Sequence, residues 1–230
     1  MSNAGLYIWR IIKLAMLFGL IELPQLALGL PGLLRRHLVS GPFVYVATWV
    51  LFIGGYVAVV FTLYTLLQSR HPERKIVRKP KGHEVNTVII GFVALMLAKT
   101  VIGSFMTQQT ANDAQIEKLY SISINTSLMM VVMTAIAAPI VEEFVFRGFL
   151  MDYFFADSPF FAIILSGLVF GSVHSSSNLI SWVMYVTMGL ILAAVYNRER
   201  NLAASILVHF LNNLLPSLFM LMSSMHQFLK

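Results

Sequence analysis

Long apolar runs alternate with short polar connections along most of the chain. A helix needs about 20 mainly apolar residues to cross the hydrocarbon layer of a membrane. Seven stretches come close to that length, at about 5–30, 43–67, 85–106, 127–150, 159–175, 179–196 and 202–222. The first contains Glu22 and Pro24, which would create an eighth helix if they divide it in two. The pattern predicts an all-α fold, a polytopic α-helical membrane bundle of about seven or eight transmembrane helices.

Composition supports lipid as the main solvent of this chain. Charged residues make up 11% and apolar residues 58% of the sequence, whereas soluble domains carry about 25% charged residues. No polar block is long enough for a soluble domain, so residues 1–230 are expected to form a single integral membrane domain. The sequence has no cysteine, which excludes disulfides, thiolate metal sites and cysteine nucleophiles. The basic, apolar N-terminal run lacks an obvious cleavage site and is expected to be an uncleaved first helix.

Basic residues in the connections predict the orientation of the helices. The stretch "QSRHPERKIVRKPKGHE" carries six Lys and Arg residues, so the positive-inside rule places it in the cytoplasm. Anchoring of this loop to anionic lipid is a simpler role for it than substrate docking. Counting helices from this loop places the polar stretch 107–126 outside and Asn197–Asn201 inside. "LRRHL" at 34–38 then falls outside, against the rule, unless the first segment is two helices or lies in the membrane interface.

A few polar side chains interrupt the apolar runs. They are Glu142, Glu143 and Arg147 in the fourth run, His174 in the fifth, and His209, Asn212 and Asn213 in the seventh. A charged group costs about 2.5–3.5 kcal/mol at the centre of a membrane helix, so such groups face a cavity or a partner. Glu143 and Arg147 are four residues apart and can form an ion pair on one helix face. Glu142 is rotated about 100° from Glu143 and can point elsewhere.

These side chains admit several interpretations when each is taken alone. A single histidine can simply join two helices by a hydrogen bond, and the Glu–Glu–Arg group can be a helix end at the membrane surface. Together, a carboxylate, two imidazoles and an amide are the groups that a water-activating site requires. A zinc site of Glu142, His174 and His209 is an alternative, although the His-Glu-x-x-His spacing is absent. A proton-coupled transporter is a further alternative.

Other protease types have weaker support in the sequence. A serine–histidine intramembrane protease would need Ser172 or Ser175 beside His174, but no acidic partner is evident. An intramembrane aspartate pair would need Asp152 and Asp157, which lie at the end of a run.

Three short motifs resemble those of a known family. "EEFVFR" (Glu142–Arg147) is similar to the EExxxR motif of the CPBP family, the CAAX proteases and bacteriocin-processing enzymes also called Abi proteins. "FGSVH" (Phe170–His174) fits the second motif, FxxxH, and "HFLNN" (His209–Asn213) fits the third, HxxxN. The three motifs occur in the family's order, within residues 127–216. The resemblance implies a helical membrane bundle with an intramembrane active-site cavity and a glutamate-dependent endopeptidase activity that requires no metal or other cofactor.

The resemblance also implies a role for each motif residue. Glu142 would activate water together with His174, and His209 and Asn213 would donate hydrogen bonds to the oxyanion. Glu143 and Arg147 would form a supporting ion pair, although Arg147 could instead bind a substrate carboxylate. Phe170 is the first residue of the second motif and is expected to support the site. Asn212 lies outside the motifs and is expected to contact a neighbouring helix.

Joint catalysis requires Glu142, His174 and His209 to lie at a similar depth. If the fourth helix ended at Val141, Glu142 would lie near the inner surface, about 20 Å from the depth of His174. The helix is therefore predicted to continue through the motif to about Phe155. The expected protein is a multi-pass enzyme of a bacterial cell membrane that cleaves a peptide or membrane protein in peptide maturation, bacteriocin immunity or signalling. No nucleic-acid partner is expected. The alternative is a non-proteolytic scaffold or immunity protein on the same fold.

Overall fold

A computed structural model describes residues 3–36, 41–155 and 157–229, and these residues contain helices and no strand. The helical elements are, in order, α1 (Asn3–Glu22), η1 (Leu23–Gly29), α2 (Leu30–Arg36), α3 (Pro42–Arg70), α4 (Gly82–Gly103), α5 (Ala111–Tyr120), α6 (Ile124–Val131), η2 (Val132–Ala137), α7 (Ala138–Glu143), η3 (Phe144–Leu150), α8 (Met151–Phe155), α9 (Pro159–Val173), α10 (Leu179–Glu199) and α11 (Leu202–Phe228). The predicted all-α class is confirmed.

Six helices in the described residues are long and apolar enough to cross a membrane. They are Gly5–Leu33, Pro42–Arg70, Gly82–Gly103, Ile124–Phe155, Leu179–Glu199 and Leu202–Phe228. The fifth predicted run, at about 159–175, forms α9, which is shorter at 15 residues. The first segment remains one span, because the chain after Glu22 tightens into a 3₁₀ helix at Pro24 and continues into α2. The eighth helix that a division there would create is therefore not formed. Part of the predicted outer connection, residues 37–40, lies outside the described residues.

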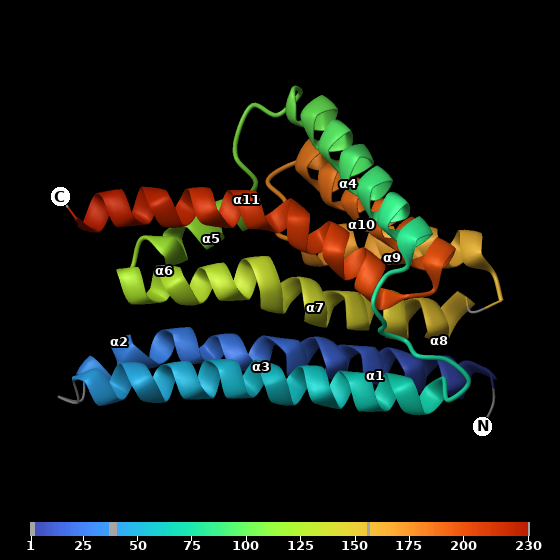
Figure 1. The fold of residues 1–230 in the computed structure, drawn as a ribbon, viewed down its shortest axis with the longest axis horizontal. Helices are drawn as coiled ribbons and strands as arrows, with labels where there is room; N and C mark the ends of the chain where they lie inside the picture. Colours follow the sequence, from blue (N-terminus) through green and yellow to red (C-terminus); the bar gives the residue numbers. More distant parts are fainter. Residues whose placement is uncertain (1–2, 37–40, 156, 230) are drawn as a thin grey trace.

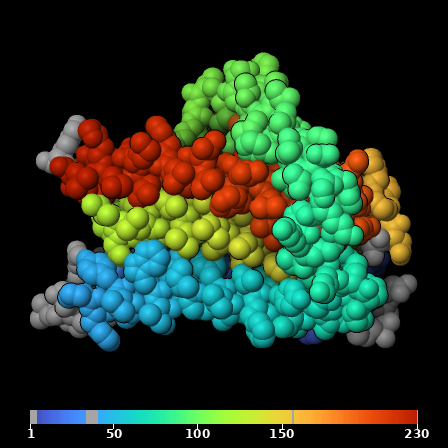
Figure 2. Space-filling view, in the orientation of Figure 1, coloured from blue at the N-terminus to red at the C-terminus, as the bar shows by residue number. Residues whose placement is uncertain are grey.

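The long helices are arranged around the fourth span (Figure 1). Helices α1 and α3 run antiparallel along one side of it, and α11 runs along the opposite side. Helix α4 crosses the bundle obliquely and packs on α10 and α11, while α9 packs closely on α10. In the space-filling view, the C-terminal end of α4 projects beyond the remaining helices (Figure 2). The fourth span is therefore covered by other helices on several sides, which suits a helix that carries buried charges.

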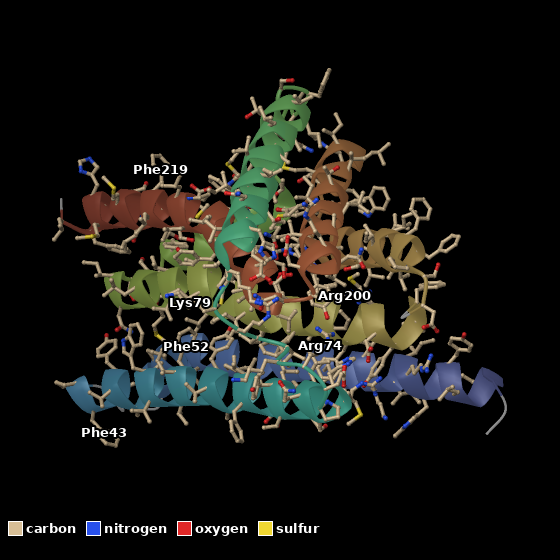
Figure 3. The ribbon with its side chains drawn as sticks, turned by 45° about the vertical axis from the view of Figure 1, so that its right-hand side comes forward. Phe43, Phe52, Arg74, Lys79, Arg200 and Phe219 are labelled. Atoms are coloured by element: carbon tan, nitrogen blue, oxygen red, sulfur yellow. The ribbon has the colours of Figure 1, made fainter. Side chains whose placement is uncertain are left out.

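The periphery of the bundle is apolar, as a lipid-facing surface requires. Phe43 on α3 and Phe219 on α11 are exposed and point away from the molecule, whereas Phe52 is fully buried (Figure 3). In water such a surface would promote aggregation, whereas lipid tails solvate it. The exposed phenylalanines and the six long helices together support a multi-pass membrane protein.

The two basic connections that were predicted to share one side of the membrane lie together. Asn201, in the turn between α10 and α11, accepts a hydrogen bond from the Arg78 N–H and donates one to the Arg78 carbonyl. Arg74 donates to the Arg200 carbonyl at 2.7 Å, and the two residues lie side by side in Figure 3. The loop after α3 and the turn after α10 are therefore at the same end of the bundle. Their cytoplasmic location stays a prediction.

The fourth span continues through the motif as predicted, and it changes its winding on the way. Residues Val132–Ala137 and Phe144–Leu150 form π-helical turns on either side of α7. Pro139 has no N–H and would collide with the preceding turn of a regular α-helix. The wider π turn accommodates it, with the Ala138 N–H bonded to the Met133 carbonyl five residues back. Glu142 and Glu143 are thus presented from the middle of a 32-residue helix, Ile124–Phe155.

Small residues allow α9 and α10 to approach closely. Gly167 and Gly171 are four residues apart on α9, the spacing of small residues at many membrane helix contacts. A Cβ atom on Gly171 would lie 2.3 Å from Cγ2 and 2.8 Å from the backbone nitrogen of Val186. A Cβ on Gly189 would lie 2.9 Å from the Gly167 Cα. This contact positions the end of α9, where His174 lies.

We expect Gly171→Leu to destabilise the protein by roughly 1–3 kcal/mol, the usual cost of overpacking. The reason is that the neighbouring atom at 2.8 Å belongs to the α10 backbone and cannot rotate away. Thermal unfolding in detergent measures the effect. Gly54→Leu is the matched control, because a Cβ at Gly54 has open space around it. Equal melting temperatures for the two variants would contradict the close α9–α10 contact.

Candidate active site

The motif residues meet at a cavity of about 520 Å³ inside the bundle. Glu142 from α7, His174 at the end of α9, and His209 and Asn213 from α11 all line it. Glu143, Arg147 and Phe170 lie behind its wall and are fully buried. The remaining polar residues that line the cavity are Glu22, Gln25, Tyr56, Lys99, Asn112, Asp113, Gln115, Thr134, Ser175, Tyr185, Asn212 and Ser217. The three motifs therefore converge in space, although more than 60 residues separate the first from the last.

A buried ion pair supports the wall of the cavity. Arg147 Nη1 lies 2.9 Å from Glu143 Oε1, and neither side chain is exposed. This confirms the predicted pairing at four-residue spacing. Arg147 also donates to the Gly189 carbonyl on α10 at 3.0 Å. His209 Nδ1 lies 3.0 Å from the same Glu143 oxygen. One carboxylate oxygen thus joins the fourth span to α11, and its arginine joins the span to α10.

The hydrogen-bond partners of His209 determine how its ring is used. An ionised carboxylate only accepts hydrogen bonds, so the Nδ1 that contacts Glu143 carries a hydrogen. The other nitrogen, Nε2, lies 3.9 Å from Glu142 Oε2. That separation is an ion-pair distance and too long for a direct hydrogen bond. His209 therefore lies between two glutamates, bonded to Glu143 and near Glu142.

Glu142 is the more exposed of the two adjacent glutamates. Its side chain is 19% exposed, whereas that of Glu143 is completely buried. Glu142 Oε2 has no hydrogen-bond partner among the described residues. The two adjacent glutamates thus differ as the helical rotation predicts, with Glu143 used for structure and Glu142 facing the cavity.

His174 is held in one orientation at the cavity wall. Its Nδ1 lies 2.7 Å from the Phe170 carbonyl oxygen, which can only accept, so Nδ1 carries a hydrogen. In the neutral ring, Nε2 is then an acceptor. The ring stacks on Tyr185 at a centroid distance of 4.7 Å and contacts the Phe170 ring at 4.3 Å. His174 ends α9 with an extended backbone conformation, so its side chain leaves the helix at the cavity.

Phe170 packs against Arg147 and against both histidines. Its ring lies 4.9 Å from the Arg147 guanidinium and makes an edge contact with the His209 ring at 5.9 Å. A guanidinium over an aromatic face is stabilised by the ring quadrupole. Arg147 is absent from the described lining of the cavity. Its position therefore favours the supporting role over contact with a substrate carboxylate.

A chain of hydrogen bonds orients the amides of α11. Asn213 donates to the Thr134 carbonyl at 2.9 Å and accepts from Asn212 at 2.7 Å. Asn212 in turn accepts from Lys99 on α4 at 3.1 Å. In the π turn, the Thr134 carbonyl faces position 139, where proline offers no N–H. Because of Pro139, the Thr134 carbonyl is left free to accept the hydrogen bond from Asn213.

Two parts of the site were not anticipated from the sequence. Lys99 lies within an apolar run. Like the charged motif residues, it is a charge in a membrane helix, which indicates a functional site. Helix α5 lies in the stretch predicted as an outer loop, yet Asn112, Asp113 and Gln115 line the cavity. The Asn112 N–H bonds to the Ser175 carbonyl, which holds α5 next to His174. Asn212 contacts neighbouring helices as expected and lines the cavity as well.

The described residues contain one group with the spacing of metal ligands, and it lies at the other end of α4. His83, Glu84 and Glu199 each offer a ligand atom within 4.8 Å of the others. Arg78 already binds both Glu84 oxygens, and Thr87 donates to Glu199, so these carboxylates have partners without a metal ion. Within the described chain, Glu142, His174 and His209 do not form such a group. The geometry therefore gives little support to the zinc alternative.

Comparisons with known proteins agree with the motifs. Residues 124–215 match the family described as type II CAAX prenyl endopeptidase Rce1-like. A UPF0177 protein in the abiGi 5' region of Lactococcus lactis subsp. cremoris is 31% identical over 206 residues, covering 87% of this chain and 86% of the relative. No solved structure matches the chain significantly.

Two other relatives match over a smaller part of their length. The UPF0177 protein YvdC of Lactococcus lactis subsp. lactis is 29% identical over 55% of this chain, which spans about half (49%) of that relative. The membrane-embedded CAAX protease MroQ of Staphylococcus aureus is 26% identical over 64% of this chain and 62% of its own length. The matched family segment holds all of the motif residues.

We expect Arg147→Met to lower the free energy of unfolding by about 3–5 kcal/mol, because it leaves the Glu143 charge buried without its cation. The exposed pair Arg70–Asp152 provides the control, and Arg70→Met should cost less than about 1 kcal/mol. The double variant Glu143→Met/Arg147→Met should recover part of the loss. Denaturant titration in mixed micelles measures all three. A loss for Arg147→Met as small as that for Arg70→Met would show that the pair is not needed.

Proposed function

Since this chain is a multi-pass membrane protein of the bacterial CPBP family of CAAX-type proteases, we propose that it is an intramembrane endopeptidase in which Glu142 activates water. The observation that carries the proposal is the difference between the two glutamates. Glu143 is fully buried and binds Arg147 and His209 through one oxygen, whereas Glu142 is partly exposed and lines the cavity. A general base must be able to reach a water molecule and a substrate.

In the proposed first step, Glu142 and His174 orient the attacking water. Both residues line the same cavity, and each offers an acceptor: the Glu142 carboxylate and, in the neutral ring, His174 Nε2. A water molecule has two hydrogens and can donate one to each acceptor. Glu142 takes one proton as the water oxygen bonds to the scissile carbonyl carbon, and it returns that proton to the leaving amine when the C–N bond breaks.

The developing oxyanion would be stabilised from α11. Asn213 has two amide hydrogens, of which one binds the Thr134 carbonyl, so the other is available. His209 can donate from Nε2 only when both ring nitrogens carry hydrogens, because Nδ1 is bonded to Glu143. The proposed acting form of His209 is therefore the imidazolium, which the Glu143 carboxylate stabilises by hydrogen bonding. Donors fixed in advance in a membrane interior stabilise a new negative charge strongly.

The substrate would be a peptide or a membrane-protein segment. The cavity, at about 520 Å³, lies within the usual range for ligand pockets, and it is lined by apolar residues around the polar group. The names of the relatives refer to CAAX proteolysis and to an abi gene region. Roles in peptide maturation, bacteriocin immunity or signalling fit such an enzyme. The competing hypothesis is a non-proteolytic scaffold or immunity protein with the same fold.

We expect Glu142→Gln to lower kcat for peptide cleavage by about 10²- to 10⁴-fold, because the amide is isosteric but is no longer a base. The assay compares purified protein in detergent on a library of apolar peptides, read by mass spectrometry. Peptidomics of a deletion strain that carries either wild type or Glu142→Gln provides the test in cells.

Glu117→Gln on the exposed side of α5 is the control, since it also replaces one carboxylate by an amide. It should cleave as fast as wild type. Undiminished cleavage by Glu142→Gln would rule out the glutamate mechanism. If neither the wild type nor the control cleaves any peptide, in the assay or in cells, the scaffold hypothesis is preferred.

We expect chelators to leave cleavage unchanged, because the proposed mechanism uses carboxylate, imidazole and amide groups only. The measurement is the initial rate after dialysis against EDTA and 1,10-phenanthroline, compared with dialysis against buffer. Loss of activity that returns on addition of zinc would revive the alternative in which Glu142, His174 and His209 bind that metal.

A further inference from the structure

Lys99 is a cation in the cavity that the proposed catalytic steps do not use. It extends from α4 and is the single Lys or Arg among the described residues that line the cavity. Its amine donates one hydrogen bond, to Asn212 Oδ1 at 3.1 Å. Among the described residues its amine makes no ion pair, although the charge of Asp113 attracts it, and two of its three N–H groups have no hydrogen-bond partner there. A charged side chain in a membrane helix is energetically costly, and such residues usually belong to a binding or catalytic site.

The position of Lys99 relates it directly to the reacting groups. Asn212, its partner, lies three residues after His209, or about 4.5 Å of helix rise. An extended peptide advances about 3.3 Å per residue, so only a few residues of substrate separate the scissile bond from the ammonium group. The acidic residues that share the cavity are Glu22, Asp113 and Glu142. These three carboxylates, including Asp113 near Lys99, would repel an anionic part of a substrate. Lys99 is the cation in the described lining that can attract such a group.

We propose that Lys99 determines substrate specificity by binding a carboxylate of the substrate peptide, within a few residues of the scissile bond. This inference rests on the proposed endopeptidase function. Asn212 holds the amine at the cavity wall, and the two free N–H groups bind the two carboxylate oxygens. The carboxylate belongs either to the C-terminus of the peptide or to an Asp or Glu side chain. Arg147 cannot take this role, because it is fully buried and does not line this cavity.

A purely positioning role for Lys99 is the main alternative. The bond to Asn212 continues through Asn213 to Thr134, so the lysine could serve only to orient the oxyanion amide. The two roles differ in what they require of the side chain. Orientation needs one hydrogen-bond donor, which glutamine also supplies, whereas carboxylate binding needs the charge. Lys99→Gln therefore keeps the first role and removes the second.

The test uses wild type, Lys99→Gln and Lys99→Arg in nanodiscs and three peptide pools of matched apolar sequence. One pool ends in a carboxylate, the second in a carboxamide, and the third in a carboxamide with one internal Glu. We expect wild type to prefer one of the carboxylate-bearing pools over the plain amide by about ten- to hundred-fold in kcat/KM, the range of a charge-assisted hydrogen bond. The preference should lie mainly in KM.

Lys99→Arg should retain the preference, and Lys99→Gln should cleave all pools at the rate of the amide pool. Whichever carboxylate pool is preferred identifies the source of the group. The proposal is overturned if wild type cleaves all three pools at equal rates, if Lys99→Gln still distinguishes the pools, or if Lys99→Gln slows all pools equally through kcat.

A binding measurement separates this proposal from the proposed function. The same pools are titrated against Glu142→Gln and Glu142→Gln/Lys99→Gln proteins by microscale thermophoresis, with no cleavage required. Tighter binding of a carboxylate pool that depends on Lys99 supports the lysine site. Equal affinities for all three pools overturn it. Failure of wild type to cleave any pool counts against the endopeptidase alone.

Discussion

The contact of Glu143 with Arg147 and His209 is the constraint on which the site depends. Two charges that are completely removed from solvent are tolerated only with close partners. Glu143 and Arg147 pair within the fourth span, and each has a further partner on another helix. The carboxylate holds α11 through His209, while the guanidinium holds α10 through the Gly189 carbonyl. That carbonyl is reached where glycines let α9 and α10 approach closely. The geometry of the cavity follows from these contacts, because they bring the third motif and the end of α9 to the same depth as Glu142.

The two neighbouring glutamates show how one helix supports both structure and chemistry. A rotation of about 100° per residue sends consecutive side chains in different directions. The Glu143 side chain packs among the helices, and its Oε1 binds both Arg147 and His209. The Glu142 side chain lines the cavity. The π turns on either side locally change the winding that sets these directions. The division of roles is therefore a property of the helix as much as of the residues.

Much of this arrangement was predictable from the sequence, for a physical reason. Polar residues are rare in membrane helices, so Glu142, His174 and His209 stood out, and the need for a common depth correctly predicted a helix that continues to Phe155. The four-residue spacing also predicted the Glu143–Arg147 pair. Helix α5 was not predictable in this way, because its polar composition is typical of a loop and its position depends on contacts with the turn after His174. Lys99 is also a charge in an apolar run, but it belongs to none of the three motifs, so the sequence alone did not connect it with the site.

Pro139 has a consequence for the register of two helices. A residue without an N–H leaves the Thr134 carbonyl to be satisfied from outside its own helix, and Asn213 on α11 supplies the hydrogen. Sliding α11 by one turn would remove this bond and the contact of His209 with Glu143 together. The missing N–H of Pro139 thus helps to fix the position of α11 along the fourth span. It thereby sets the Asn213 amide relative to the glutamates before any substrate binds.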